Sequence, residues 1–431
     1  MSQRYHRSEQ MLERARRVIP LGSQTFSKSI TALPYGVSPY FAERAKGSRL
    51  WDVDGNEYID LVNGLACVTL GYCDPDVDRA VREQMENGVT FSLPHRLEAE
   101  VAELMVEMVP CAERVRFAKN GTDATSAAVR LARAWTGREH VAVCGYHGWQ
   151  DWYIGSTSRD LGVPRGVKEL THPFQYNDVS SLQRLLKERP GQYAAVILEP
   201  MTTEFPRDGF LDAVRDAAHA DGALLVFDET ITGFRYGLGG AQHEFGVVPD
   251  LATFGKGLAN GYPLSALVGR ASIMDLLEQV FFSGTFGGET LSLAAARAVL
   301  TKLRTEPVIE TLRVRGQRLF DEVQRLIADL AIGHVIRISG HPSWSFLHFS
   351  DVGPVSKWHL KTFFLQEVFK RGVYTLGTHN LSYAHTSEDI EAVVRCYGEV
   401  FRLMGSAVAH ETLPESLECA PLVPLFTVRQ A

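Results

Sequence analysis

Three residues that each follow an apolar, strand-like run have side chains suited to chemistry. Asp228 follows the run ALLVF, Glu199 follows AAVIL, and Lys256 stands between two glycines shortly after LATF. In open α/β sheets, ligands bind beyond the carboxyl ends of the strands. A carboxylate buried there is unstable unless a positive group pairs with it, and an uncrowded lysine can act as an amine nucleophile. The alternatives are that Asp228 only caps a helix or forms an ion pair, and that Lys256 is solvated.

The segment Asn120-Gly121-Thr122 is a candidate phosphate cradle, because it precedes the apolar periodicity of a helix over 122–135. Free N–H groups at a helix start bind phosphate, and Gly121 would allow a close approach. Simple helix capping is the alternative for this segment.

One ligand would use all of these groups. Pyridoxal phosphate (PLP) needs a phosphate site, which Gly121 and Thr122 could form, and a lysine that forms a Schiff base, which Lys256 could supply. It also needs a carboxylate that keeps the pyridine nitrogen protonated, so that the ring acts as an electron sink. Asp228 would meet that pyridinium, whose charge offsets the burial of the carboxylate.

Alternating strand-like and helix-like segments would position these residues. The strand-like segments are 114–118, 140–145, 192–200, 222–229, 250–256 and 264–270, and helices are predicted at 96–109, 122–135 and 209–221. This alternation predicts an α/β fold with a mostly parallel central sheet that is covered by helices on both faces. Residues 49–64 predict two short strands joined by a turn, and a long helix is expected to begin near Glu289.

Four parts of the chain are expected. An N-terminal segment (1–65) would pack with the small domain and with a dimer partner, and residues 66–305 would form the large PLP-binding domain. Residues 306–410 predict a small C-terminal α+β domain. The prolines of residues 411–431 predict an extended tail.

The bulk composition narrows the class of protein. The formal net charge is −7 over 431 residues, so no basic footprint points to nucleic acid. No run of about 18 apolar residues suggests a membrane span, and no leader-like apolar stretch opens the chain, so a cytoplasmic protein is expected. The six cysteines are scattered and never form a CxxC pair, which favours reduced thiols over disulfides or a metal site.

Four blocks in a fixed order resemble the class III (omega) aminotransferases of PLP fold type I, and among them the glutamate-1-semialdehyde 2,1-aminomutase-like proteins. The blocks are FAKNGTDATSAAVRLAR, YHGWQDW, LLVFDETITGFRYGLGGAQHEFGVVPDLATFGKGLANGYPLSALVGR and SGTFGGETLSLAAA. The resemblance covers about residues 45–400, and several motifs in one order are more specific than any single motif.

The resemblance implies a role for each matched residue. The catalytic pair would be Lys256, as the Schiff-base lysine, and Asp228, as the partner of the pyridine nitrogen. The cofactor-binding set would add Gly121 and Thr122 at the phosphate, Tyr146 stacked on the ring, Glu199 near the phenolic oxygen, Thr230 against the ring, and Thr285 at the phosphate of the neighbouring subunit. Because Thr285 would act across the interface, the resemblance implies a homodimer with shared active sites.

The chain departs from the aminomutase pattern at substrate-facing positions. Thr230 replaces a usual valine, and its hydroxyl is either silent or in contact with substrate. Lys28 stands where an arginine would hold the substrate carboxylate, and Leu65 stands near the place of a tryptophan. Lysine cannot make the two parallel hydrogen bonds of arginine. Lys28 and His147 are the candidate substrate residues.

Three functions are compatible with these residues. The first is an aminotransferase that moves an amino group between an amino donor and a small carbonyl acceptor, such as a sugar or a phosphorylated metabolite. The alternative is a true glutamate-1-semialdehyde 2,1-aminomutase, which needs no external donor. A catalytically silent PLP-binding homologue is disfavoured because Lys256, Asp228 and Gly121-Thr122 are all intact.

Overall fold

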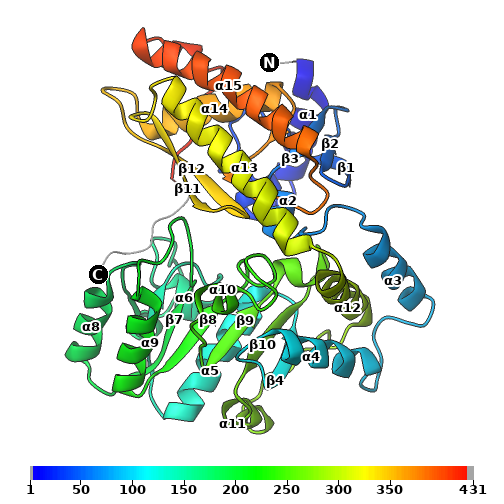
Figure 1. Ribbon diagram of the computed structural model, residues 1–431, viewed down its shortest axis with the longest axis vertical. Coiled ribbons are helices and arrows are strands. Elements are labelled where there is room, and N and C mark those ends of the chain that lie inside the picture. The colour runs from blue at the N-terminus through cyan, green and yellow to red at the C-terminus, as the bar shows by residue number, and fades with distance from the viewer. Residues whose placement is uncertain (1–2, 425–431) are drawn as a thin grey trace. The chain divides into compact units, whose positions relative to one another are not determined.

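The computed structural model describes residues 3–424 and divides the chain into two compact units (Figure 1). The large unit contains Ala66–Val68 and Pro75–Ile309. The small unit contains the described residues up to Leu65, Thr69–Asp74, and those from Glu310 onward. The N-terminal segment and the C-terminal region therefore belong to one compact unit.

A seven-stranded sheet forms the centre of the large unit. Its strand order is β4 (Arg114–Ala118), β10 (Ser265–Gly269), β9 (Leu251–Phe254), β8 (Leu224–Asp228), β7 (Tyr193–Leu198), β5 (His140–Cys144) and β6 (Thr171–Pro173). Strand β10 runs antiparallel to both of its neighbours, and the other pairs are parallel. The predicted mostly parallel sheet is confirmed, whereas β6 was not predicted because it has only three residues and ends in a proline.

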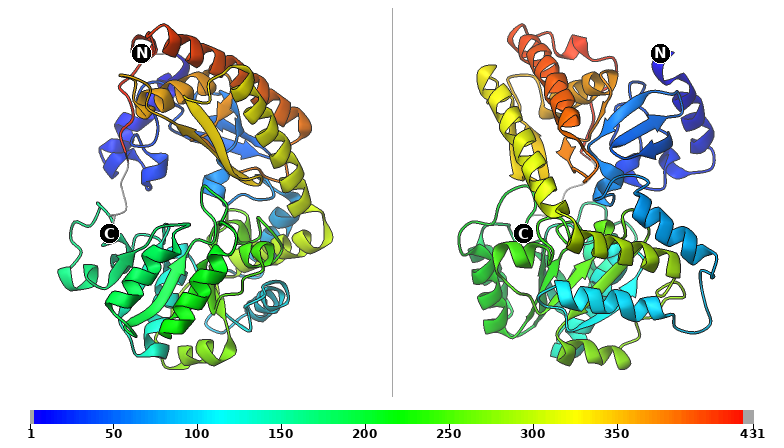
Figure 2. Two further views of the ribbon diagram at one scale, coloured as in Figure 1. Left: turned by 60° about the vertical axis from the view of Figure 1, so that its left-hand side comes forward. Right: turned by 45° about the vertical axis from the view of Figure 1, so that its right-hand side comes forward.

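Helices lie on both sides of this sheet, as the two views of Figure 2 show. Every residue of β7 and β8 is buried, which is expected of strands covered on both faces. The helices of this unit are α3 (Pro75–Met85), α4 (Arg96–Met108), α5 (Gly121–Thr136), α6 (Asp151–Ile154), α7 (Arg165–Lys168), α8 (Val179–Glu188), α9 (Phe210–Asp221), α10 (Ala241–Phe245), α11 (Ala271–Met274) and α12 (Thr290–Thr305).

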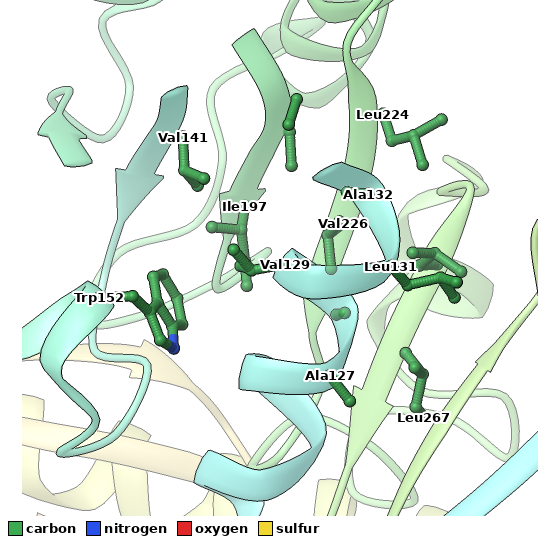
Figure 3. Packing of buried hydrophobic residues seen from close by; sticks show 14 of the residues in the cluster. Ala127, Val129, Leu131, Ala132, Val141, Trp152, Ile197, Leu224, Val226 and Leu267 are labelled. Carbon is green, nitrogen blue, oxygen red and sulfur yellow. The ribbon is translucent and has the colours of Figure 1, made fainter. Parts of the chain in front are cut away.

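The core of the large unit fixes the helix that begins at the candidate phosphate cradle. Ala127, Leu131 and Ala132 of α5 pack with Ile197 of β7 and Val226 of β8 (Figure 3). Small alanines on this face let the helix lie close to the sheet. Helix α5 ends at Gly137, whose φ of 68° provides the left-handed C-cap. The start of α5 is therefore held by the same core that holds the strands.

Two smaller sheets and several helices make up the small unit. One sheet has the order β1 (Ala42–Lys46), β2 (Arg49–Asp52), β3 (Glu57–Asp60) and β13 (Val373–Tyr374), and the other has the order β11 (Ile336–His341), β12 (Trp344–Phe349) and β14 (Thr378–His379). The helices are α1 (His6–Arg16), most of α13 (Val308–Asp329), α14 (Lys357–Lys370) and α15 (Ser387–Ala409), and the short α2 (Asn63–Ala66) lies at the unit boundary. The two short strands predicted within 49–64 are confirmed as β2 and β3.

The expected extended tail is described only as far as residue 424, and residues 425–431 lie outside the described part. It contains one 3-10 turn, Pro414–Ser416, and otherwise has neither helix nor strand. The tail lies along α14, because Gln366 Nε2 donates to Ser416 O at 3.1 Å and Leu422 N donates to Thr362 Oγ1 at 2.9 Å.

Within residues 3–424, no helix combines the length and the apolar character needed to cross a membrane.

Candidate active site

One edge of the seven-stranded sheet brings the predicted residues together. Asp228 ends β8, Glu199 follows β7, Lys256 follows β9 after Gly255, and Gly121 begins α5 three residues after the end of β4. Strands β7, β8 and β9 are parallel. Strand β4 has the same direction, since it and β9 are both antiparallel to β10. All four carboxyl ends therefore lie at the same edge, where ligands of α/β sheets bind.

Four hydrogen-bond donors surround the buried carboxylate of Asp228. Its Oδ2 lies 2.9 Å from His147 Nδ1. Its Oδ1 accepts from Thr230 N at 3.1 Å, Thr230 Oγ1 at 2.5 Å and Thr253 Oγ1 at 3.1 Å. Burial alone would raise the pKa of Asp228, but the hydrogen bonds from His147 and Thr230 outweigh it and hold the pKa below its ordinary value. The group is therefore an anion at neutral pH.

His147 was expected to face the substrate, and the structure places it against Asp228 instead. The side chain is only 1% exposed, and Nε2 is buried without a hydrogen-bond partner. The ring packs edge-on against Tyr153, with centroids 5.2 Å apart. His147 therefore supports the carboxylate of Asp228 through Nδ1.

Glu199 has surroundings that differ from those of Asp228. The donor to its Oε2 is Tyr146 N, at 2.8 Å. Gly145 has a φ of 107°, and a Cβ there would lie 2.5 Å from the same oxygen, so only glycine fits. Burial, together with the nearby charge of Asp228, raises the pKa of Glu199 to about 7. The two carboxylates thus have pKa values that are moved in opposite directions.

Lys256 adopts the left-handed backbone conformation, with a φ of 42°. This conformation is uncommon for a side chain other than glycine or asparagine and is found most often at functional positions. Burial lowers the pKa of Lys256, while the charges of Glu199 and Asp228 oppose that effect. A lowered pKa leaves more of the amine neutral and therefore nucleophilic. The pKa of Lys256 is also influenced by Cys67 and Arg235, two residues that the sequence analysis missed.

The start of α5 fits a phosphate group. The Oγ1 of Thr122 is buried and has no hydrogen-bond partner, which calls for a ligand acceptor. The neighbouring acidic residue, Asp123, is turned back and accepts from Asn120 N at 2.8 Å. Gly148 approaches so closely that a Cβ there would lie 2.3 Å from Thr122 Oγ1. Free N–H groups and an unused hydroxyl are therefore available together at this helix start.

Tyr146 presents an open aromatic ring beside these groups. The side chain is 50% exposed, and its ring lies edge-on to that of Tyr153, with centroids 5.6 Å apart. An exposed ring that is braced from one edge can stack on a flat ligand.

Two predicted residues lie in other surroundings. Thr285 is exposed and lines a hollow of about 570 Å³ in the large unit, together with Asp123, Ser126 and Phe286. Lys28 is exposed and lines a pocket of about 210 Å³ that is formed wholly by the small unit.

The residues around Asp228 also include Thr253, which was not predicted from the sequence. Thr253 is opposite Asp228 in the β8–β9 ladder. It is the one hydroxyl residue in the buried strand LATF, and a buried hydroxyl normally needs a hydrogen-bond partner. The need of this buried hydroxyl for a hydrogen-bond partner was the feature of the sequence that could have identified Thr253.

Comparisons with known proteins agree with this fold. Residues 31–385 match the family Aminotransferase class-III. The chain is 33% identical to the 3-aminobutyryl-CoA aminotransferase of Cloacimonas acidaminovorans (strain Evry), over 92% of this chain and 98% of that protein. It is 35% identical to the glutamate-1-semialdehyde 2,1-aminomutase of Syntrophobacter fumaroxidans (strain DSM 10017 / MPOB), over 92% of this chain and 97% of that protein.

A solved structure shows the same fold. The FumI protein of Sphingopyxis sp. MTA144, in its PLP internal aldimine form, superposes with a TM-score of 0.87 at 30% identity, over 97% of this chain and 99% of that chain. The chain therefore belongs to the class III aminotransferases, a family of PLP-dependent enzymes, and its cofactor is PLP. The predictions of the family, of PLP fold type I and of the cofactor are confirmed.

Proposed function

We propose that the protein is an aminotransferase that moves an amino group between an amino donor and a small carbonyl acceptor, with Lys256 as the amine that holds PLP. The observation that carries this proposal is the environment of Asp228. Its carboxylate is buried and anionic, and no lysine or arginine among the described residues donates a hydrogen bond to it, since its donors are His147, Thr230 and Thr253. A positively charged ring nitrogen would complete that environment.

The other residues fit the remaining parts of the cofactor. Thr122 and the N–H groups that open α5 would hold the phosphate, and Tyr146 would lie against the ring. When bound, PLP supplies an electron sink for the substrate carbon. Asp228 would hold the proton on the ring nitrogen, and Lys256 Nζ would move a proton between the substrate carbon and C4′ of the cofactor. Glu199, with its pKa raised to about 7, can either donate or accept a hydrogen bond near the phenolic oxygen.

We also propose a homodimer in which Thr285 serves the phosphate of the neighbouring subunit. Phe286, which lines the hollow beside Thr285, is 58% exposed, and Phe281, which lies near it in the sequence, is 80% exposed. Exposed aromatic clusters of this kind mark protein–protein contacts. A second copy of the chain would cover them and bring Thr285 to the cofactor. A monomer in sedimentation that keeps full PLP content and activity would contradict this arrangement.

The proposed acceptor is not glutamate-1-semialdehyde. One relative is named for that substrate and another for 3-aminobutyryl-CoA, so the family members similar to this chain differ in substrate. Lys28 and Leu65 line the pocket of the small unit in place of the arginine and the tryptophan of the aminomutase pattern. A lysine there can attract an anion such as a carboxylate or a phosphate, but it orients it less well than arginine does. A sugar or a phosphorylated metabolite remains the proposed substrate, and the cytoplasm the proposed location.

Three measurements on the holoenzyme test the proposal. Borohydride reduction should attach the cofactor to the peptide that contains Lys256, and a label on another lysine would refute the assignment. A screen of amino donors, followed by the absorbance change from PLP to its aminated form, should identify the donor. With glutamate-1-semialdehyde and no added donor, 5-aminolevulinate should not form. Efficient formation would establish the aminomutase alternative instead.

A further inference from the structure

Thr230 is placed to act on Asp228. Its Oγ1 lies 2.5 Å from Asp228 Oδ1, and its backbone N–H donates to the same oxygen at 3.1 Å. A hydroxyl carries a single proton. Because that proton is donated to Asp228, it is not available for a hydrogen bond to a substrate. The sequence is compatible with a Thr230 hydroxyl that has no role or that contacts the substrate. The geometry favours a third role, in which the hydroxyl acts on Asp228.

The methyl group of Thr230 fixes the direction of the hydroxyl. A Cβ at Gly121 would lie 3.0 Å from Thr230 Cγ2, and a Cβ at Gly255 would lie 3.3 Å from it. The methyl is therefore held between the start of α5 and the residue that precedes Lys256. A β-branched side chain has few rotamers, so a methyl fixed there also fixes the hydroxyl against Asp228. Valine would keep the methyl and lose the donor, whereas serine would keep the donor and lose the methyl.

The donors to Asp228 are divided unequally between its two oxygens. Oδ1 accepts three hydrogen bonds, two from Thr230 and one from Thr253, while Oδ2 has only the contact with His147. A carboxylate has about two acceptor sites on each oxygen. Oδ1 is therefore saturated, and Oδ2 is the oxygen with room for a further partner. Each donor to a carboxylate stabilises the anion and weakens its hold on any other proton.

We propose that Thr230 is a positioning residue that occupies Oδ1 of Asp228, leaves Oδ2 for the cofactor, and weakens the hold of that carboxylate on the ring-nitrogen proton. This inference rests on the proposed function, in which Asp228 is the partner of that nitrogen. A valine at this position would leave Asp228 with one donor fewer and a stronger pull on the proton. The hydroxyl of Thr230 thus limits how strongly Asp228 keeps the ring nitrogen protonated, and with it the strength of the electron sink.

Binding of two aminated cofactors tests the inference without any turnover. The first is pyridoxamine phosphate, and the second is its 1-deaza analogue, which has a carbon in place of the ring nitrogen. Both are added to full-length protein freed of PLP, and their dissociation constants are compared. Thr230→Val should tighten pyridoxamine phosphate by about tenfold and leave the deaza analogue unchanged, because only the nitrogen carries the proton that Asp228 holds. Thr230→Ser should resemble the unmodified protein.

The remaining outcomes separate this inference from the proposed function. An equal change for both ligands, or a weaker binding of pyridoxamine phosphate by Thr230→Val, would overturn the role of the hydroxyl. Should Thr230→Val fail to fold, Thr230→Ala also lacks the hydroxyl and should give the same selective tightening. Asp228→Asn should abolish the preference for pyridoxamine phosphate. If Asp228→Asn leaves the preference intact, the proposed function fails. If Asp228→Asn removes it while Thr230→Val has no effect, only the present inference fails.

Discussion

Asp228 and Glu229 are adjacent, acidic and buried, yet they serve two different regions of the large unit. Asp228 lies at the sheet edge, where Lys256 and Glu199 meet. Glu229 serves the start of α10, where its Oε2 accepts from Ala241 N at 2.7 Å and its Oε1 accepts from Gln242 N at 3.0 Å. The sequence does not distinguish the two carboxylates, whereas their partners do.

The distribution of donors separates the two roles better than their number does. Glu229 also has four donors, but they fall two on each oxygen, with Thr232 Oγ1 and Gln242 Nε2 completing the set. Burial raises the pKa of Glu229 even so, whereas the pKa of Asp228 is lowered. A carboxylate that is filled on both oxygens is a structural cap. One with an open oxygen is prepared for a ligand.

Asp228→Asn is expected to have the largest effect on activity. Loss of a positioned charge at a reacting cofactor is typically about 3–4 kcal/mol, so the half-reaction with an amino donor should slow by roughly 10³-fold. Glu229→Gln is the matched control, because it makes the same change from carboxyl to amide at the next residue. Single-turnover absorbance measures both rates. Equal losses in the two variants would remove the functional distinction between the two regions.

Glu199→Gln tests a carboxylate whose pKa is raised. The folded state holds the proton of Glu199 up to about pH 7, whereas the ordinary value is 4.5. Its contribution to stability is therefore full below pH 4.5 and is lost as the pH rises through 7, by at most about 3 kcal/mol. In protein freed of PLP, the free energy of unfolding should fall less across this window in Glu199→Gln than in the unmodified protein. Parallel pH profiles in urea unfolding would show that the glutamate is not held in its protonated form.

Glu229→Gln is expected to lower the free energy of unfolding and to have little effect on the rate of the reaction. The amide nitrogen cannot accept from the N–H groups that open α10, and a buried donor left unsatisfied costs about 1–3 kcal/mol. Urea unfolding at neutral pH should show this loss, while the rate per bound PLP changes by less than about threefold. A variant of normal stability with a much lower rate would reverse the roles assigned to the two neighbours.

Lys28→Gln is expected to have the smallest effect. An exposed ion pair contributes up to about 1 kcal/mol, so the KM for an anionic acceptor should rise by no more than about fivefold, with kcat unchanged. The rise should shrink at high salt, because exposed charges are screened. A loss of kcat would show that position 28 acts in the chemical step and not only in binding of the acceptor.

Much of this site was predictable because long apolar runs mark buried strands. The strands that carry Asp228, Glu199 and Lys256 were each predicted from such a run, and their carboxyl ends then had to meet at one edge. The antiparallel course of β10 follows from the short connection at 255–264, since a parallel return needs a dozen or more residues.

The partners of Asp228 were less predictable because they are distant in the sequence. His147 lies 81 residues before it and Thr253 lies 25 residues after it. Nothing in the local pattern of either residue names its partner. The separate duties of Asp228 and Glu229 likewise depend on which backbone N–H groups arrive from α10, and these are set by tertiary packing.

The short connection between β9 and β10 also bears on how the protein folds. Phe254 pairs with Ala266 across this connection, whereas the contact between His147 and Asp228 closes a loop of 81 residues. Longer loops cost more chain entropy, and contacts between distant residues slow folding. The contacts around the connection that carries Lys256 are therefore between residues close in the sequence. The contacts around Asp228 require strands that are distant in the sequence to pack together. During refolding, we therefore expect the turn that carries Lys256 to form before the surroundings of Asp228, and we expect the later step to limit productive capture of the cofactor.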